Sequence, residues 1–255
     1  MKVMAIQMPI KDGDVEANKL KLEQLLDLHS GADLYLLPEL WSSGFFIDKW
    51  QDIAENSTPE LLHWLSQEAA KRKIYLAGSL ITKNDEGNYV NRLTMFNREG
   101  KLMVEYDKVH LFLPMGEGFL ERGQKVNIVE IEGFRIAFGI CYDLRFPEMF
   151  RKLALKTVDL FLVVAEWPKE RHDALINLAA ARAIENQCYL LLSNRIGKDC
   201  FRESFAGASG LYGPWGPIVF SYDEGAFGGE INLNDLKAAR EVLNVFDERV
   251  EGVDF

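Results

Sequence analysis

The sequence predicts an α/β fold in which helices cover a β-sheet. Short apolar runs such as residues 159–165 alternate with longer amphipathic runs such as residues 14–28. A strand that is apolar throughout is buried on both faces, so helices are expected to cover the sheet. Hairpin-like strands between residues 89 and 107 and after residue 209 add antiparallel pairs. Two sheets stacked face to face, with helices outside, would accommodate this number of strands, although periodicity alone does not establish the second sheet.

The amino-terminal half alternates predicted strands and helices. The helix predicted over residues 14–28 carries apolar residues at helical spacing with charges between them. A second helix is predicted over residues 59–73, and the pair Thr58 and Pro59 is typical of a capped first turn. The predicted strands of this half are residues 3–8, 34–37, 74–81, 89–97 and 102–107, the last two joined by a turn at residues 98–101.

The carboxyl-terminal half continues the alternation. The strand predicted over residues 134–140 stops at Cys141, and Pro147 suits the first turn of a helix over residues 147–156. The other predicted strands are residues 159–165, 189–193, 209–212, 218–222 and 229–233, and the other predicted helices are residues 173–186, approximately, and 236–242. No repeat, linker or low-complexity tract divides the chain, so we expect one domain over residues 1–255.

The composition excludes several classes of partner. Hydrophobic residues make up 48% of the chain and charged residues 27%, as in a globular protein with a substantial core. The net charge of −10 and the absence of a lysine or arginine cluster argue against nucleic acid and anionic membranes as partners. No stretch is long and uncharged enough to predict a membrane span or a signal peptide.

Cysteine and histidine usage narrows the chemistry further. The three cysteines, Cys141, Cys188 and Cys200, lie far apart, which argues against a disulfide framework and fits a reducing cytoplasm. The four histidines show no metal-ligand spacing, and no phosphate-binding glycine motif occurs. We therefore expect no metal and no dinucleotide or ATP cofactor.

Cys141 stands at a strand-to-helix corner. A thiol there projects from the end of a sheet, and the amide N–H groups beside it are free to bind a developing negative oxygen. The alternative is a buried cysteine acting as a small hydrophobic residue, which is the commoner fate of a free thiol. The corner and the polar residues that follow it raise the case for a catalytic cysteine, so that on this feature alone the two interpretations are about equally supported.

Two more strand ends carry reactive side chains. Glu39 follows the strand over residues 34–37, and Lys108 follows the strand ending at Asp107. Sites in α/β folds lie at the carboxyl ends of strands. Glu39 as general base, Lys108 as oxyanion stabiliser and Cys141 as nucleophile would make an acyl-transfer site. Taken singly, Glu39 is better explained as a helix cap or a solvated charge, and Lys108 as a surface lysine.

Four blocks in order make the chain resemble the nitrilase superfamily of carbon–nitrogen hydrolases over nearly its whole length. The blocks are Leu36-Leu37-Pro38-Glu39-Leu40 with Gly44-Phe45, Tyr106-Asp107-Lys108-Val109-His110-Leu111-Phe112, Gly139-Ile140-Cys141-Tyr142-Asp143-Leu144-Arg145-Phe146-Pro147-Glu148, and Ala181-Arg182-Ala183-Ile184-Glu185-Asn186-Gln187 with Asn194-Arg195-Ile196-Gly197.

The resemblance implies a four-layer α-β-β-α sandwich whose catalytic residues are Glu39, Lys108 and Cys141. It also matches Glu117 to a second glutamate that orients the lysine, and it makes the backbone N–H of Tyr142 the second oxyanion donor. A thioester would form, ammonia would leave, and water activated by Glu39 would release the acid. The resemblance further implies a homodimer joined near the helix over residues 173–187, whose apolar face could equally be core: Ala174, Leu175, Leu178, Ala181 and Ile184.

The substrate class rests on the segment Glu166-Trp167-Pro168, which is most similar to the omega-amidase branch. Enzymes of that branch deamidate monoamides of small dicarboxylates, such as 2-oxoglutaramate and 2-oxosuccinamate. One departure concerns a pocket wall, where the chain has Arg171-His172-Asp173-Ala174-Leu175 in place of the branch's usual His-Trp.

Two residues are candidate substrate contacts. Trp167 is either a substrate-facing wall or an aromatic packed at the sheet end. Arg145 could bind a substrate carboxylate, but we expect a structural ion pair with an acidic neighbour. His110 is expected to donate a structural hydrogen bond, and Cys188 and Cys200 are expected to be inert.

Several functions compete with the omega-amidase hypothesis. Another small aliphatic amidase, an N-carbamoyl amidase, a deaminated-glutathione amidase or a nitrilase would share the same catalytic residues. A different reaction class would use Lys108 as a Schiff-base former, and a binding protein that has lost activity is a third possibility. The presence of Glu39, Lys108, Cys141 and Glu117 together favours an enzyme.

Overall fold

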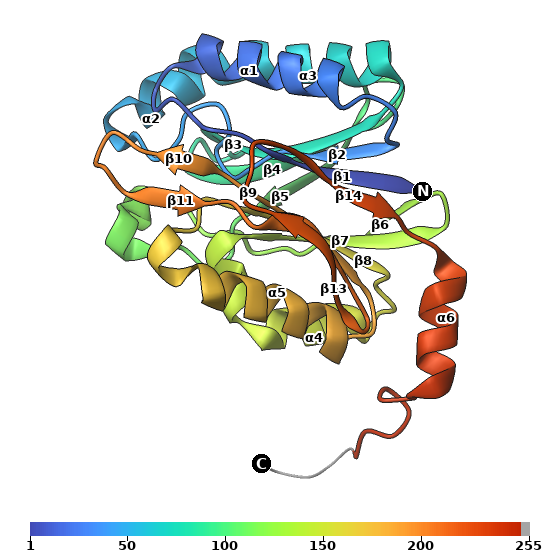
Figure 1. The fold of residues 1–255 in the computed structure, drawn as a ribbon. Helices are drawn as coiled ribbons and strands as arrows, with labels where there is room; N and C mark the ends of the chain where they lie inside the picture. Colours follow the sequence, from blue (N-terminus) through green and yellow to red (C-terminus); the bar gives the residue numbers. More distant parts are fainter. Residues whose placement is uncertain (251–255) are drawn as a thin grey trace.

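The computed structural model describes residues 1–250 and contains two six-stranded sheets stacked face to face (Figure 1). The first sheet has the strand order β14 (Gly225–Glu230), β1 (Lys2–Gln7), β2 (Leu34–Leu36), β3 (Tyr75–Lys83), β4 (Tyr89–Phe96) and β5 (Leu102–Asp107). The second has the order β13 (Gly216–Ser221), β12 (Ser209–Gly213), β9 (Tyr189–Asn194), β8 (Leu160–Ala165), β7 (Phe134–Ile140) and β6 (Val129–Ile131).

Both sheets share one plan, with three parallel strands beside antiparallel neighbours. Strands β1, β2 and β3 run parallel, and β4, β5 and β14 are antiparallel additions. Strands β7, β8 and β9 are the parallel set of the second sheet, flanked by the antiparallel β6, β12 and β13. Among the parallel strands, β2, β8 and β9 are buried at every residue, as expected for strands covered on both faces.

Helices cover the outer face of each sheet, which completes the four layers (Figure 1). The first sheet is covered by α1 (Val15–Leu28) and α3 (Thr58–Arg72), and the second by α4 (Pro147–Ala154) and α5 (His172–Glu185). Helix α1 begins where predicted because the Asp14 side chain accepts a hydrogen bond from the Ala17 N–H at 3.1 Å. Helix α6 (Leu233–Val242) lies at the far end of the molecule (Figure 1).

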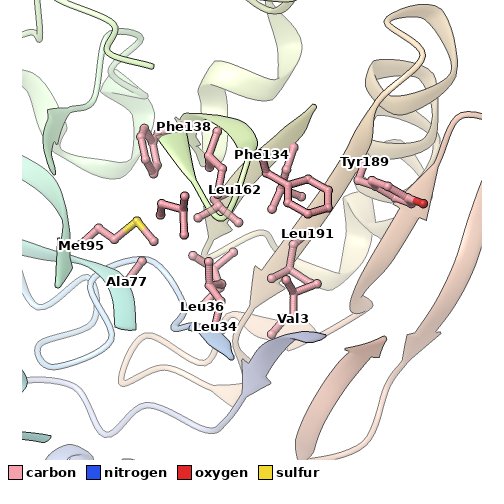
Figure 2. Packing of buried hydrophobic residues seen from close by; sticks show 14 of the residues in the cluster. Val3, Leu34, Leu36, Ala77, Met95, Phe134, Phe138, Leu162, Tyr189 and Leu191 are labelled. Atoms are coloured by element: carbon pink, nitrogen blue, oxygen red, sulfur yellow. The ribbon is translucent and has the colours of Figure 1, made fainter. Parts of the chain in front are cut away.

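The main core lies between the two sheets. Figure 2 shows Val3, Leu34 and Leu36 of the first sheet meeting side chains of the second, such as Leu162 and Leu191. Two further clusters fill the spaces between each sheet and its helices. Alternate residues of a strand therefore face different clusters: Leu162 of β8 lies between the sheets, whereas Phe161 and Val163 lie against the helices.

Several predicted boundaries need correction. The predicted cap at Thr58 is wrong: its hydroxyl donates to the Ile81 carbonyl at 2.8 Å. The helical segment begins earlier, with α2 (Trp50–Asp52) and a π-helical stretch over Ile53–Ser57 that leads into α3. Burial of Trp50 and Ile53 beside Phe45 extends the helical segment beyond its local cap signal.

The last strand differs from its predicted position, and three short strands have no predicted counterpart. Strand β14 covers Gly225–Glu230 instead of residues 229–233, and Asn232 caps α6, which begins at Leu233. Strand β6 and the hairpin β10 (Ile196–Lys198) and β11 (Ser204–Ala206) were not predicted. Each has three residues, too few for a period of two to be visible in the sequence. Within residues 1–250, no helix has the length and apolar character needed to cross a membrane.

Candidate active site

The predicted site residues meet at the carboxyl ends of strands from both sheets. Glu39 follows β2, Lys108 follows β5, and Cys141 follows β7 directly. Lys108 Nζ lies 2.9 Å from Glu39 Oε1 and 2.7 Å from Glu117 Oε1, and Cys141 lies close enough to Glu39 that burial and this carboxylate together raise the pKa of the thiol. The structure thus brings together four residues from distant parts of the chain.

Glu39 is held by three donors. Its Oε1 accepts from Lys108 Nζ and from Asn91 Nδ2, at 2.9 and 2.8 Å. Its Oε2 accepts from the backbone N–H of Glu166 at 2.9 Å. Because Glu39 is fully buried, these bonds replace the water that an ionised carboxylate would otherwise need. The carboxylate is fixed in position with its thiol partner beside it.

The protonation states follow from burial and from the cluster's own charges. Burial and the charge of Glu39 raise the pKa of Cys141 well above its usual value, although Lys108 opposes this shift. Burial alone would lower the pKa of Lys108, but the charges of Glu39 and Glu117 outweigh it and raise that pKa. Burial raises the pKa of Glu117, against the opposing charge of Lys108. The resting site therefore holds a neutral thiol and a charged ammonium.

The state of Lys108 bears on the Schiff-base alternative. A lysine forms a Schiff base only as the neutral amine, which requires a lowered pKa. Lys108 has a raised pKa and donates to two carboxylates. Two of its three N–H bonds have acceptors among residues 1–250, so the third is available to a substrate oxygen. This geometry favours an oxyanion-stabilising role.

A strained turn displays the thiol. Cys141 has φ of 47°, a left-handed conformation that non-glycine residues rarely adopt. It opens the 3₁₀ turn Cys141–Arg145, whose first amides, including that of Tyr142, have no acceptor within the turn. These N–H groups are the ones that an oxyanion next to the sulfur would meet.

Asp143 holds this turn in place, and sequence reasoning gave it no role. Its buried carboxylate accepts from the Ile140 N–H, the Tyr106 hydroxyl and the His110 N–H, at 2.9, 2.7 and 2.8 Å. His110 Nδ1 also lies 2.7 Å from the same carboxylate, which confirms the structural hydrogen bond expected of His110. Asp143 therefore ties the cysteine turn to the strand end that carries Lys108.

A small cavity of about 40 Å³ opens beside the thiol. Its wall is formed by Phe112, Met115, Cys141, Tyr142, Arg145, Glu166, Trp167, Pro168 and Arg171. Trp167 both lines this cavity and packs in the core under the second sheet, so the two interpretations of Trp167 hold together. Its ring N–H donates to the Arg171 carbonyl at 2.8 Å.

Arg145 does not form the predicted ion pair. Within residues 1–250, no carboxylate lies within 4.0 Å of its guanidinium, which instead lies 4.6 Å from the ring centroid of Trp167. Arg145 is one of the residues that line the cavity. Cys188, by contrast, is fully buried, and burial raises the pKa of its thiol, as an inert cysteine requires.

A second buried charge cluster adjoins the site and was not predicted. Arg195 Nη1 lies 2.6 Å from Glu166 and 3.1 Å from Asp12, and its Nη2 donates to the Ile10 carbonyl at 2.6 Å. Burial raises the pKa of Glu166 to about 8, although the charge of Arg195 opposes the shift. Both Glu166 and Arg195 stood in sequence blocks quoted above; they follow the neighbouring strands β8 and β9, and only the contacts with Asp12 and Ile10 reach the loop after β1 of the other sheet.

Comparisons with known proteins give one consistent family. The carbon–nitrogen hydrolase family model matches residues 2–241. The chain is 32% identical over 250 residues to the 2-oxoglutaramate amidase of Bacillus subtilis (strain 168), with 96% of each protein covered. It is 33% identical over 254 residues to the omega-amidase YafV of Yersinia enterocolitica, with 97% of this chain and 96% of that protein covered.

Solved structures agree. The crystal structure of XC1258 from Xanthomonas campestris, described as a CN-hydrolase superfamily protein with an arsenic adduct in the active site, superposes with a TM-score of 0.91. It is 29% identical, and the match covers 100% of this chain and 99% of that one. An amidase from Nesterenkonia sp. gives a TM-score of 0.82 at 25% identity, over 89% of this chain and 88% of that one. These matches confirm the predicted fold class.

Proposed function

The chain belongs to the carbon–nitrogen hydrolase family, and on that premise we propose that it is an omega-amidase that releases ammonia from 2-oxoglutaramate or 2-oxosuccinamate. The relatives named 2-oxoglutaramate amidase and omega-amidase support this substrate class. The observation that carries the proposal is the contact of Glu39 with both Lys108 and the Cys141 thiol beside a cavity.

In the acylation half, Glu39 takes the thiol proton as the sulfur of Cys141 attacks the amide carbon. The carbonyl oxygen becomes negative and accepts hydrogen bonds from Lys108 Nζ and from the Tyr142 N–H. Glu39 then gives its proton to the amide nitrogen, the C–N bond breaks, and ammonia leaves. A thioester on Cys141 remains. A neutral resting thiol is consistent with this order, because the proton moves only when substrate is in place.

In the deacylation half, Glu39 removes a proton from water, whose oxygen attacks the thioester carbon. The C–S bond breaks, the sulfur regains the proton, and the acid leaves. Glu117 accepts a hydrogen bond from Lys108 at 2.7 Å and so holds the ammonium toward the oxyanion through both halves. Trp167 and Arg145 would contact the rest of the substrate from the cavity wall.

The test is ammonia release from 2-oxoglutaramate by the wild type and by Cys141→Ala. We expect the variant to lose at least about 1,000-fold in kcat, because covalent catalysis requires the thiol. Cys200→Ala is the matched control, since that cysteine is exposed and lies outside the cavity. Intact mass spectrometry should show an acyl adduct on the wild type and none on Cys141→Ala.

Two outcomes would overturn the proposal in different ways. Full activity in Cys141→Ala would remove the thioester mechanism. Hydrolysis of simple aliphatic amides, carbamoyl compounds or nitriles, with no turnover of 2-oxoglutaramate, would keep the mechanism and remove the substrate class.

We further propose that the enzyme is a cytoplasmic homodimer. Helix α5 buries Leu175, Ala179 and Ala183 against its sheet. Of the apolar face predicted as possible core, Leu175 is buried and Ala174 and Leu178 pack partly buried against the core, whereas Ala181 is partly buried and Ile184 is 45% exposed. A second copy of the chain would cover this apolar face, and light scattering should give twice the mass of 29.1 kDa. The three free thiols fit a reducing compartment.

A further inference from the structure

The catalytic cavity carries two arginines on its wall besides the reacting groups. Arg145 and Arg171 line the cavity from two different segments of the chain. Arg145 ends the 3₁₀ turn that begins at Cys141, and Arg171 ends the 3₁₀ turn that leads into α5. We propose that Arg171 selects substrates that carry a carboxylate, with Arg145 completing an anion subsite in the cavity. This inference rests on the proposed amidase function, because it names the residue that recognises the non-reacting end of the substrate.

Both guanidinium groups are pre-positioned by aromatic rings of the cavity wall. Arg145 lies 4.6 Å from the ring centroid of Trp167, and Arg171 lies 5.6 Å from that of Phe112. The Trp167 ring N–H also donates a hydrogen bond to the Arg171 carbonyl, so the ring that Arg145 covers is joined to the backbone of Arg171. Stacking fixes the plane of a guanidinium and leaves the N–H groups at its edge available. Such a fork matches the two oxygens of a carboxylate.

Neither guanidinium forms a close ion pair with the protein, although a hydrogen bond with Glu203 and the charge of Arg171 lower the pKa of the nearby Glu170. Within residues 1–250, no carboxylate lies within 4.0 Å of Arg145 or Arg171, and neither side chain donates a hydrogen bond. The chain has 39 acidic and 29 basic residues, so partners are in excess. Other arginines do form ion pairs with carboxylates: Arg92 donates to Asp107 through two nitrogens, at 2.6 and 2.9 Å. Two unpaired arginines beside the nucleophile indicate an anionic ligand.

The space beyond Arg171 limits where that anion can lie. A second cavity of about 420 Å³ shares Met115, Pro168 and Arg171 with the catalytic cavity. Its outer wall carries the acidic residues Asp199 and Glu203. A carboxylate that extended past Arg171 would be repelled there. Arg171 therefore marks the far end of a short substrate, as expected for a dicarboxylate monoamide of four or five carbons.

The test compares two amides of matched shape. Succinamate carries a carboxylate, and levulinamide (4-oxopentanamide) replaces it with a neutral acetyl group. We expect Arg171→Ala to lower the ratio of kcat/KM for succinamate over levulinamide about 10- to 100-fold, mainly through KM, because a charge-assisted bidentate contact is lost. Arg171→Lys keeps the charge without the fork and should give an intermediate ratio. Lys169→Ala, an exposed cation on the same turn, should keep the wild-type ratio.

Binding measurements separate this inference from the proposed function. Titration calorimetry of succinamate into Cys141→Ala, with and without Arg171→Ala, reports the anion subsite even where no turnover occurs. Weaker binding in the double variant supports the subsite. An unchanged ratio in Arg171→Ala, or equal binding in the two variants, overturns it. Turnover of 2-oxoglutaramate with an unchanged ratio would leave the amidase standing and remove only the role of Arg171.

Discussion

Two buried charge clusters lie side by side between the sheets, and each places one cation between two carboxylates. In the catalytic cluster, Lys108 lies between Glu39 and Glu117. In the neighbouring cluster, Arg195 lies between Glu166 and Asp12. Glu166 links the two, because its backbone N–H donates to Glu39 while its side chain accepts from Arg195.

The difference between the clusters lies in what adjoins the cation. Lys108 keeps one N–H for a substrate oxygen, and a thiol and a cavity lie beside it. Arg195 uses its fork to join Glu166, Asp12 and the Ile10 carbonyl, which bridges the loop after β1 and the ends of β8 and β9. On the proposed mechanism, this arrangement of charges serves chemistry in one place, whereas in the other it joins separate segments of the chain. Substitutions should separate the two roles.

The largest expected effect is on catalysis, in Glu39→Gln. Glutamine can still accept from Lys108 and Asn91 but cannot take the thiol proton. We expect kcat to fall about 1,000- to 10,000-fold, or about 4–5.5 kcal/mol of transition-state stabilisation. The free energy of unfolding, from urea titration, should change far less. A loss of unfolding free energy as large as the loss of transition-state stabilisation would contradict the separation of roles.

The second expected effect is on stability, in Arg195→Met. This change leaves Glu166 and Asp12 without their shared cation in a buried site, which typically costs about 3–5 kcal/mol. Urea unfolding should show this loss, and the residual folded enzyme should keep its acyl adduct on Cys141. The matched control is Arg122→Met, because Arg122 is exposed and makes one long contact, 3.4 Å from the Val109 carbonyl. Equal free energies of unfolding in the two variants would show that Arg195 does not stabilise the fold.

The sequence predicted the catalytic cluster far better than its neighbour, for a physical reason. Glu39, Lys108 and Cys141 each follow a strand end, and the carboxyl ends of strands gather at one edge of a sheet. Bringing the ends of two different sheets together, however, depends on how the sheets stack, which no local pattern records. The resemblance to a known superfamily, and not the periodicity, supplied that stacking.

The supporting residues were missed because their signals are weak in sequence. Asn91 is a buried polar residue in β4, a strand that also holds Arg92 and Thr94, and its hydrogen bond to Glu39 depends on the neighbouring structure and has no local signal. Asp143 stands two residues after the nucleophile, where a polar residue predicts no particular partner. The contact of Arg145 with Trp167 was missed because a cation over a distant aromatic ring has no sequence signature.

The smallest expected effect concerns pH and the link between the clusters. Burial raises the pKa of Glu166 from its usual 4.5 to about 8, against the pull of Arg195. The folded protein therefore holds a proton on Glu166 between about pH 4.5 and 8 that the unfolded chain releases. Since the native state binds more protons, the contribution of Glu166 to stability is largest below pH 4.5 and declines as the pH rises to about 8.

Glu166→Gln removes this titration and keeps the backbone N–H that donates to Glu39. Urea unfolding at pH 5, 6.5 and 8 should show the wild type losing stability relative to the variant at each step. Glu148→Gln, which changes an exposed carboxyl on α4, should show no such trend. A constant difference between the wild type and Glu166→Gln would mean that Glu166 stays ionised throughout. The two clusters would then differ in what adjoins the cation and not in a proton on Glu166.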